Sequence, residues 1–215
     1  MTTPPVPKPG LHDMSFDEFQ ARYGPWRSPD PVEVAELLAE AAFPWWIAGG
    51  WALDAASGVS RFHEDVDLVI LSRDLPAFRE FFAGKHLWTP YRQALEPLWP
   101  GAEFPEGREQ IWVRDDAYSP WTLDVLLTPA VDERILFKRD HAIGMSFDEA
   151  TFTGADGVRY ISPVLALLYK ARLGRDKDDT DFAAVLPRLD AAARAWLADA
   201  LDRHLPEHKW RERLR

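Results

Sequence analysis

The segment Trp45-Trp46-Ile47-Ala48-Gly49-Gly50 begins as a short apolar strand and ends in a pair of glycines. A helix is expected over residues 51–56. Glycines between a strand and a helix let backbone N–H groups approach an anion closely, and the helix N-terminus adds a favourable dipole. Gly49 and Gly50 are therefore candidates for binding phosphate, although a glycine pair at the end of a strand is also a common turn.

Two aspartates lie at the start of the next apolar run, Asp65-Val66-Asp67-Leu68-Val69-Ile70-Leu71. On a strand, residues two apart leave the same face, so we expect Asp65 and Asp67 to project together, about 7 Å apart along the chain. Two ionised carboxylates repel each other, and a divalent cation between them removes that cost. Mg²⁺ is held by one or two carboxylates plus substrate phosphates, which fits this pair. Solvated acids on an exposed edge strand are the alternative.

A third acid, Asp124, lies inside the apolar strand pattern Trp121-Thr122-Leu123-Asp124-Val125-Leu126-Leu127. An acid in the middle of such a strand needs a partner. A metal site shared with Asp65 and Asp67 supplies one.

The remaining elements follow from capping and turn signals. We expect the following: a helix at 15–23 with a capping box from Ser15 to Glu18; a helix at 32–42 after Asp30 and Pro31; a helix from Asp74 to about Gly84; irregular structure at 86–110; a hairpin of 111–114 with 121–128; a hairpin turning at 154–157; a helix from Pro163 to about Leu173; and helices to the C-terminus. We divide the chain into an N-terminal arm and short helix (1–28), a core (29–160) and a C-terminal helical region (161–215).

The charge balance indicates which partners to expect. Lys and Arg number 25 against 35 Asp and Glu, a net charge of −10, and cysteine is absent. Nucleic acid is not the expected partner, since phosphate backbones reward clustered cations; a cationic small molecule is attracted instead. The chain shows no secretion signal and no run long enough to span a membrane. We expect a cytoplasmic monomer or homodimer without disulfide bonds or thiolate metal sites.

The glycine and aspartate motifs together resemble a known signature. Gly49-Gly50-Trp51-Ala52-Leu53-Asp54, followed by Arg61-Phe62-His63-Glu64-Asp65-Val66-Asp67, resembles the motif of the DNA polymerase β-type nucleotidyltransferase superfamily. Within it, the match is closest to the aminoglycoside and lincosamide nucleotidyltransferases, which are adenylyltransferases. The strand around Asp124 resembles the family's third-carboxylate strand. The segments Leu168-Tyr169-Lys170-Ala171-Arg172 and Arg175-Asp176-Lys177-Asp178-Asp179-Thr180-Asp181-Phe182 resemble its C-terminal helical motif.

This resemblance implies an α+β nucleotidyltransferase fold, with a small mixed sheet flanked by helices and a C-terminal helical segment. It implies an enzyme that moves a nucleoside monophosphate, AMP from ATP being expected, onto a hydroxyl of a small aminoglycoside- or lincosamide-like acceptor. Asp65, Asp67 and Asp124 would be the catalytic acids and would hold Mg²⁺, with two ions expected. Asp124 would complete the second metal site or accept the proton of the acceptor hydroxyl.

The resemblance also implies which residues bind the nucleotide, although this chain differs from the family's motif at some positions. Gly49, Gly50, Arg61, Lys170 and Lys177 would bind the triphosphate, although the two lysines also fit a solvated helix face. The superfamily often has Gly-Ser where this chain has Gly-Gly, so triphosphate binding depends more on backbone and cations. Residues 86–110 match nothing in the family. Their acids and aromatic residues suggest an acceptor wall for a cation or, alternatively, a loop with exposed acids.

Two other functions keep the same fold. One is a nucleotidyltransferase that modifies a protein partner, of the antitoxin or AMPylation type. The other is a non-catalytic nucleotide-binding module, which a lost acid would favour; all three acids are present. A metal-dependent hydrolase using the acids alone leaves the glycine pair without a purpose.

Overall fold

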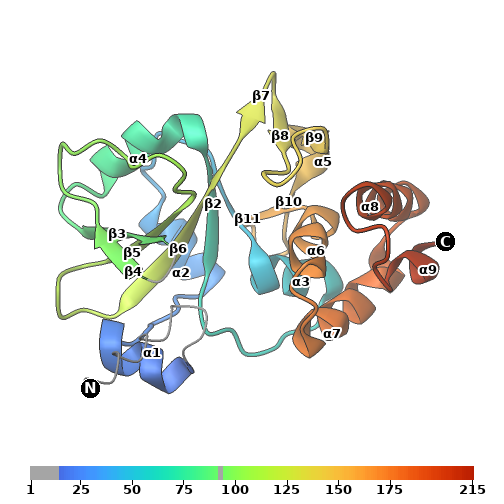
Figure 1. Cartoon of the computed structure of the whole chain (residues 1–215), viewed down its shortest axis with the longest axis horizontal. Coiled ribbons are helices and arrows are strands. Elements are labelled where there is room, and N and C mark those ends of the chain that lie inside the picture. Colours follow the sequence, from blue (N-terminus) through green and yellow to red (C-terminus); the bar gives the residue numbers. More distant parts are fainter. Residues whose placement is uncertain (1–14, 92–93) are drawn as a thin grey trace, which may run out of the picture.

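The structure is a computed structural model that describes residues 15–91 and 94–215. Among these residues, helices and strands are mixed up to residue 161, with seven strands following one another between α4 and α5, and the rest of the chain is helical (Figure 1). The α-helices are α1 (Phe16–Tyr23), α2 (Pro31–Leu37), α3 (Gly49–Ser57), α4 (Leu75–Phe81), α5 (Phe147–Ala150), α6 (Pro163–Ala171), α7 (Asp176–Val185), α8 (Ala191–His204) and α9 (Arg211–Leu214). The strands are β1 (Trp45–Ile47), β2 (Asp67–Leu71), β3 (His86–Tyr91), β4 (Ala94–Pro97), β5 (Gln110–Arg114), β6 (Trp121–Thr128), β7 (Ala130–Val131), β8 (Arg134–Leu136), β9 (Gly144–Ser146), β10 (Thr151–Thr153) and β11 (Arg159–Ile161).

A mixed sheet of eight strands organises the described residues, in the order β10-β11-β1-β2-β6-β5-β3-β4. The pairs β2–β6 and β1–β11 are parallel, and the other neighbours are antiparallel. A second, three-stranded sheet, β7-β8-β9, extends from the end of β6. The sequence predicts neither this small sheet nor its position, because its strands have only two or three residues.

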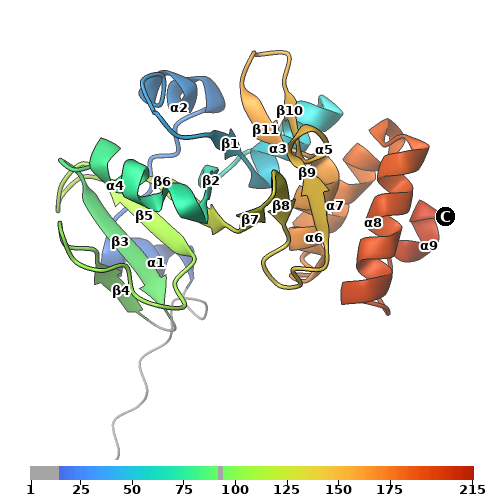
Figure 2. The ribbon, with the colours of Figure 1, turned by 90° about the horizontal axis from the view of Figure 1, so that it is seen from above.

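The central strands are apolar on both faces because both faces are covered. In β2, Leu68 and Ile70 pack into a core with α2 and α4, while Val69 packs into a second core with α6–α9. Figure 2 shows α2 and α4 on one side of the molecule and α6–α9 gathered at the other end. Among the described residues, no helix combines the length and the apolar character needed to cross a bilayer.

Several elements match the sequence-based expectations. Capping boxes begin α1, from Ser15 to Glu18, and α2, from Asp30 to Glu33. The hairpins β5–β6 and β10–β11 form where turn signals place them. The predicted boundary near residue 161 falls between β11 and α6. Because α6–α9 share one core with sheet residues, that boundary stays a prediction.

Five expectations are wrong. Residues 86–110 are not irregular throughout: β3 and β4 form an antiparallel pair that extends the sheet. The helix predicted at 32–42 ends at Leu37, and α4 ends at Phe81 rather than near Gly84. The helix after β1 begins at Gly49 itself, so the glycines form its first turn. Finally, β2 begins at Asp67, which leaves Asp65 in the preceding loop.

Candidate active site

The glycine pair lets the β2 acid and the preceding loop approach the N-terminus of α3. Gly49 has φ +60°, and a Cβ there would lie 1.8 Å from Asp67 Oδ2. A Cβ on Gly50 would lie 2.4 Å from Arg61 Nη2 and 2.5 Å from His63 Cε1. The N-cap residue, Ala48, has no side-chain acceptor for the first N–H groups of the helix. This helix end therefore keeps the property that favours an anion.

The three predicted acids lie near one another around the start of the central strand β2. Asp67 of β2 and Asp124 of β6 are direct partners in the parallel register, and the Asp124 N–H donates to Val66 O at 3.1 Å. Burial raises the pKa of Asp67 to about 7, and the charge of Asp65 adds to this rise. Burial followed by repulsion from Asp67 raises the pKa of Asp124, and burial raises that of Asp65. The acids are thus both desolvated and mutually repelling.

This donor set fits a divalent cation in its chemistry. Carboxylate oxygens are the ligands that Mg²⁺ prefers, and a bound cation would relieve the repulsion between Asp65 and Asp67. Over residues 15–91 and 94–215, however, no three Asp, Glu or His side chains gather closely enough to hold an ion. The structure therefore brings Asp67 and Asp124 together by register but does not assemble a cluster of three ligands.

Gln110 is a site residue that the sequence does not predict. Its Nε2 donates to Asp124 Oδ1 at 2.7 Å and to Oδ2 at 2.6 Å. This contact lowers the pKa of Asp124, although burial and the charge of Asp67 outweigh it. Gln110 is the first residue of β5, which pairs with β6. The sequence predicts the hairpin that contains β5 and β6. It does not predict the contact between Gln110 and Asp124, because that contact depends on the register of the two strands.

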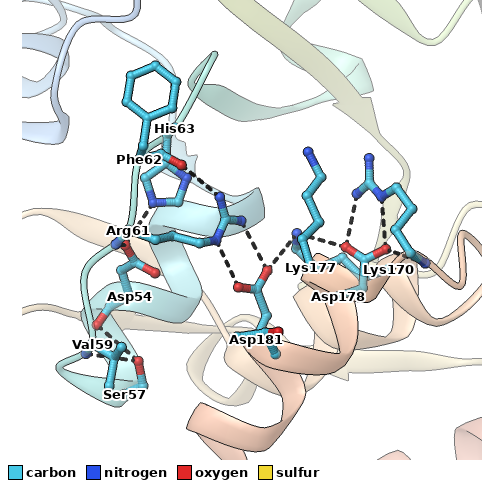
Figure 3. Close-up of polar contacts among 12 residues, drawn as sticks. Asp54, Ser57, Val59, Arg61, Phe62, His63, Lys170, Lys177, Asp178 and Asp181 are labelled. Atoms are coloured by element: carbon cyan, nitrogen blue, oxygen red, sulfur yellow. Dashed lines mark hydrogen bonds and ion pairs between the residues drawn. The ribbon is translucent and has the colours of Figure 1, made fainter.

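A network of ion pairs connects the loop before β2, residues 58–66, to the C-terminal helices (Figure 3). We call this segment the motif loop. Arg61 donates through Nε and Nη2 to the two oxygens of Asp181, at 2.9 and 3.0 Å. Lys170 Nζ lies 3.0 Å from Asp181 Oδ2 and 3.3 Å from Asp178 Oδ1. Arg175 donates through Nε to Asp178 Oδ2 at 2.9 Å. The loop before β2, α6 and α7 are held together by these contacts.

The cations predicted to bind phosphate separate into two groups. Arg61 and Lys170 are occupied in the ion network, and Lys170 is buried. The half-exposed Lys177 lies 3.9 Å from Glu64 Oε2, and its charge opposes the rise in the pKa of Asp65. Arg175 was not predicted, although it opens the α7 motif; the charges of Asp65 and Asp67 help to raise its pKa, after its hydrogen bond to Asp178. Lys170, Arg175 and Lys177 all lower the pKa of Asp67, Lys170 most strongly, so all three cations are electrostatically coupled to the acids.

A second set of contacts shapes the motif loop from the side of α3. His63 Nε2 lies 2.7 Å from Asp54 Oδ2, which also accepts the backbone N–H of Arg61 at 2.9 Å. The Trp51 ring stacks on His63 with centroids 4.3 Å apart, and its Nε1 donates to Asp65 O at 3.3 Å. Burial lowers the pKa of His63. His63 is therefore a structural residue of the loop that carries Asp65.

Two of the four acids in residues 86–110 are ion-paired. Glu96 pairs with Arg108 at 2.6 Å, and Glu109 pairs with Lys138 at 3.2 Å. Glu103 and Glu106 are in the segment between β4 and β5. A cavity of about 480 Å³ lies between this segment and α4, lined in part by Leu75, Arg79 and Phe104. None of the three acids lines it, so this cavity is separate from the candidate active site.

Comparisons with known proteins identify related folds. The family model for aminoglycoside-2″-adenylyltransferase matches residues 32–93. The crystal structure of ANT(2″)-Ia in complex with adenylyl-2″-tobramycin is similar with a TM-score of 0.52 and 19% identity, over 81% of this chain and 98% of that chain. The solution structure of the antibiotic-resistance factor ANT(2″)-Ia gives a TM-score of 0.51 at 19% identity, over 81% and 91% of the two chains. A comparison with curated protein sequences finds no match.

These similarities confirm the predicted α+β nucleotidyltransferase fold and the resemblance to aminoglycoside nucleotidyltransferases. The family match spans β1, α3, β2 and the loop before β2, and therefore includes the glycine pair, Asp65 and Asp67. Together the findings support a nucleotidyltransferase enzyme.

Proposed function

We propose that this protein transfers a nucleoside monophosphate from a nucleoside triphosphate, ATP being the expected one, to a hydroxyl group of an aminoglycoside-like small molecule. The register pairing of Asp67 with Asp124, beside the glycine N-terminus of α3, carries the proposal. It puts acids of two neighbouring strands next to a helix end suited to phosphate.

The chain's own residues would bind and orient the triphosphate. The N–H groups at Gly49 and Gly50 would face phosphate oxygens, because no side chain caps this helix end. Lys177 and Arg175 would add positive charge from α7, since both are electrostatically coupled to the acids. Arg61 and Lys170, predicted to bind phosphate directly, would act instead by fixing α6 and α7 to the motif loop.

The acids would divide the remaining work. Asp65 and Asp67 are the expected ligands of Mg²⁺, with Asp124 contributing to a second ion or accepting a proton. A bound divalent cation supplies neutralisation of phosphate charge and stabilises the developing charge in the transfer step. In the transfer, the acceptor oxygen would bond to the α-phosphorus and the bond to pyrophosphate would break. The hydroxyl proton would pass to a carboxylate oxygen of Asp124.

An aminoglycoside-like acceptor is supported by two independent observations. The family model and the structural neighbours are aminoglycoside adenylyltransferases, and one neighbour contains adenylyl-2″-tobramycin. The net charge of −10 also favours a polycationic acceptor.

The test is pyrophosphate release by the purified full chain. The protein would be incubated with Mg²⁺, each of the four common nucleoside triphosphates, and a panel of tobramycin, other aminoglycosides, a lincosamide and a neutral sugar. Release that depends on both an aminoglycoside and Mg²⁺, and that is lost in Asp67→Asn, is the expected result. A folded, nucleotide-binding protein that releases no pyrophosphate with any acceptor would contradict the proposal.

A further inference from the structure

Asp124 is held by a side chain from the neighbouring strand that no sequence motif marks. We propose that Gln110 is a positioning residue that orients the Asp124 carboxylate for the reaction. This inference rests on the proposed function, because it assigns Asp124 a role in the transfer. It concerns a contact within the protein that is present before any ligand binds.

The contact is short and symmetric. The Gln110 amide nitrogen lies 2.7 Å from one oxygen of Asp124 and 2.6 Å from the other. A donor shared by both oxygens lies close to the plane of the carboxylate and opposes its rotation. Each oxygen can still accept a further hydrogen bond or bind a cation, because an ionised carboxylate has about four lone-pair sites in all.

The stem of Gln110 is itself fixed from several sides. In the β5–β6 register its partner is Leu126, so its side chain reaches diagonally to Asp124, two residues away along β6. Its carbonyl accepts the Thr89 hydroxyl at 2.9 Å. The preceding residue, Glu109, accepts the Leu127 N–H at 2.9 Å and pairs with Lys138 at 3.2 Å. Contacts from β3, β6 and the segment after β8 therefore hold the backbone from which this side chain extends.

This placement matters because Asp124 is 7% exposed and faces the charge of Asp67. Without a donor, repulsion from Asp67 would favour turning the Asp124 side chain away from it. The Gln110 amide counters this tendency by contacting both carboxylate oxygens. Supporting residues that orient a reactive carboxylate commonly change turnover by 10-fold or more, about the lower end of values measured around metal sites.

The experiment compares Gln110→Met, Asp124→Asn and the double variant. Methionine removes the donor at similar length. We expect Gln110→Met to lower kcat by roughly 10-fold or more, while KM and the calorimetric Kd for a non-hydrolysable nucleoside triphosphate with Mg²⁺ stay within about threefold. If Gln110 acts through Asp124, adding Gln110→Met to Asp124→Asn should cause no further loss, since residues acting as a unit are not additive.

A matched control comes from the same pair of strands. Thr122 donates through Oγ1 to Val113 O at 3.0 Å, a cross-strand hydrogen bond that does not involve Asp124. Thr122→Val should keep kcat near that of the wild type. Gln110→Leu, which also lacks a donor and adds no charge, is the second variant if Gln110→Met does not fold, and the same loss of kcat is expected.

The outcomes separate the possible failures. A normal kcat in Gln110→Met or Gln110→Leu, with only a lower melting temperature, would show a structural role and overturn the inference. Losses that multiply in the double variant would also overturn it, because Gln110 would then act independently of Asp124. A folded wild-type protein without any transfer activity would instead contradict the proposed function itself.

Discussion

At the scale of single residues, Gly49 lets the backbone of α3 lie next to Asp67, one of the proposed catalytic acids. Its φ of +60° is a conformation that strains other residues, and the space of its missing Cβ is taken by Asp67 Oδ2. Gly49→Ala therefore combines backbone strain with displacement of Asp67. We expect the melting temperature to fall by several degrees, since roughly 1–2 kcal/mol of strain corresponds to at least about 2–4 °C at this chain length. Nucleotide-dependent activity should be lost as well, which a pyrophosphate assay measures.

Gly58 provides the control for Gly49. It also has a positive φ, +74°, but a Cβ there would have no atom within 4 Å. Gly58→Ala should lower the melting temperature through strain alone and leave activity per folded molecule unchanged. Equal activity in the two variants would show that the close approach of Gly49 to Asp67 is not needed for activity.

A single substitution of Asp124 distinguishes a catalytic from a structural role for this acid. Asp124→Asn keeps the shape and removes the charge, so repulsion from Asp67 falls and stability should be kept or slightly increased. Turnover should fall by roughly 10²–10⁴, the usual contribution of a positioned base. Nucleotide binding should persist, because Asp65 and Asp67 remain. A lower melting temperature with near-normal activity per folded molecule would make Asp124 a structural residue.

At the scale of elements, the ion network of the motif loop, α6 and α7 makes stability depend on pH. Burial alone would raise the pKa of Asp181, but the hydrogen bonds from Arg61 and the charge of Lys170 lower it below its ordinary value. Asp178 behaves in the same way through Arg175 and Lys170. A lowered folded-state pKa gives stability that is present above the unfolded-state pKa, about 3.9 for Asp, and lost as the pH falls through the folded value.

Urea unfolding of Asp181→Asn at several pH values tests this linkage. At pH 7 the variant should be less stable by about 3 kcal/mol, because it leaves Arg61 and the buried Lys170 with one partner fewer. The difference from wild type should shrink below about pH 4 as Asp181 becomes protonated in the wild-type protein. A difference that stays constant from pH 7 to pH 3 would show that Asp181 contributes by packing alone.

The elements that the sequence predicts well are those with local signals. Ser15, Asp30 and the turn at residues 154–157 mark their own helix ends or hairpin, and the structure has them there. β3 and β4 were missed because Pro90 and Pro97 suggest breaks. Pro97 lies in the edge strand β4, where proline is accepted, and Pro90 lies beyond the part of β3 that pairs with β5, residues 86–88. The helix after Pro31 ends at Leu37 because residues 38–40 form turns instead, which the apolar pattern does not reveal.

The candidate site was predictable where a motif is contiguous and not where the fold brings distant residues together. The glycine pair and the acids stand in one readable segment, and the predicted hairpin carries Asp124. The ion pairs of Arg61 and Lys170 with Asp181 form because α6 and α7 pack against the motif loop. Arg61 and Asp181 are 120 residues apart in the sequence. Gln110 depends on strand register in the same way.

At the scale of the whole molecule, metal and nucleotide should stabilise the protein only together. The acids would otherwise repel the phosphates, since Asp65 and Asp67 already repel each other. A non-hydrolysable nucleoside triphosphate at one hundred times its Kd should add about 2.7 kcal/mol of stability when Mg²⁺ or Mn²⁺ is present. A chelator should remove this increase in melting temperature. A shift of equal size without the metal would contradict the assignment of Asp65 and Asp67.

The most direct measurement of nucleotidyl transfer is the mass of the acceptor after the reaction. The full chain would be incubated with ATP, Mg²⁺ and tobramycin or a related aminoglycoside, and the acceptor analysed by mass spectrometry. The account predicts an acceptor heavier by one adenylyl group with wild type and an unchanged acceptor with the folded Asp67→Asn variant. Two results would contradict the proposed transfer. One is that folded, nucleotide-binding wild type leaves every aminoglycoside of the panel unmodified with all four nucleotides. The other is that Asp67→Asn gives the same yield of modified acceptor as wild type.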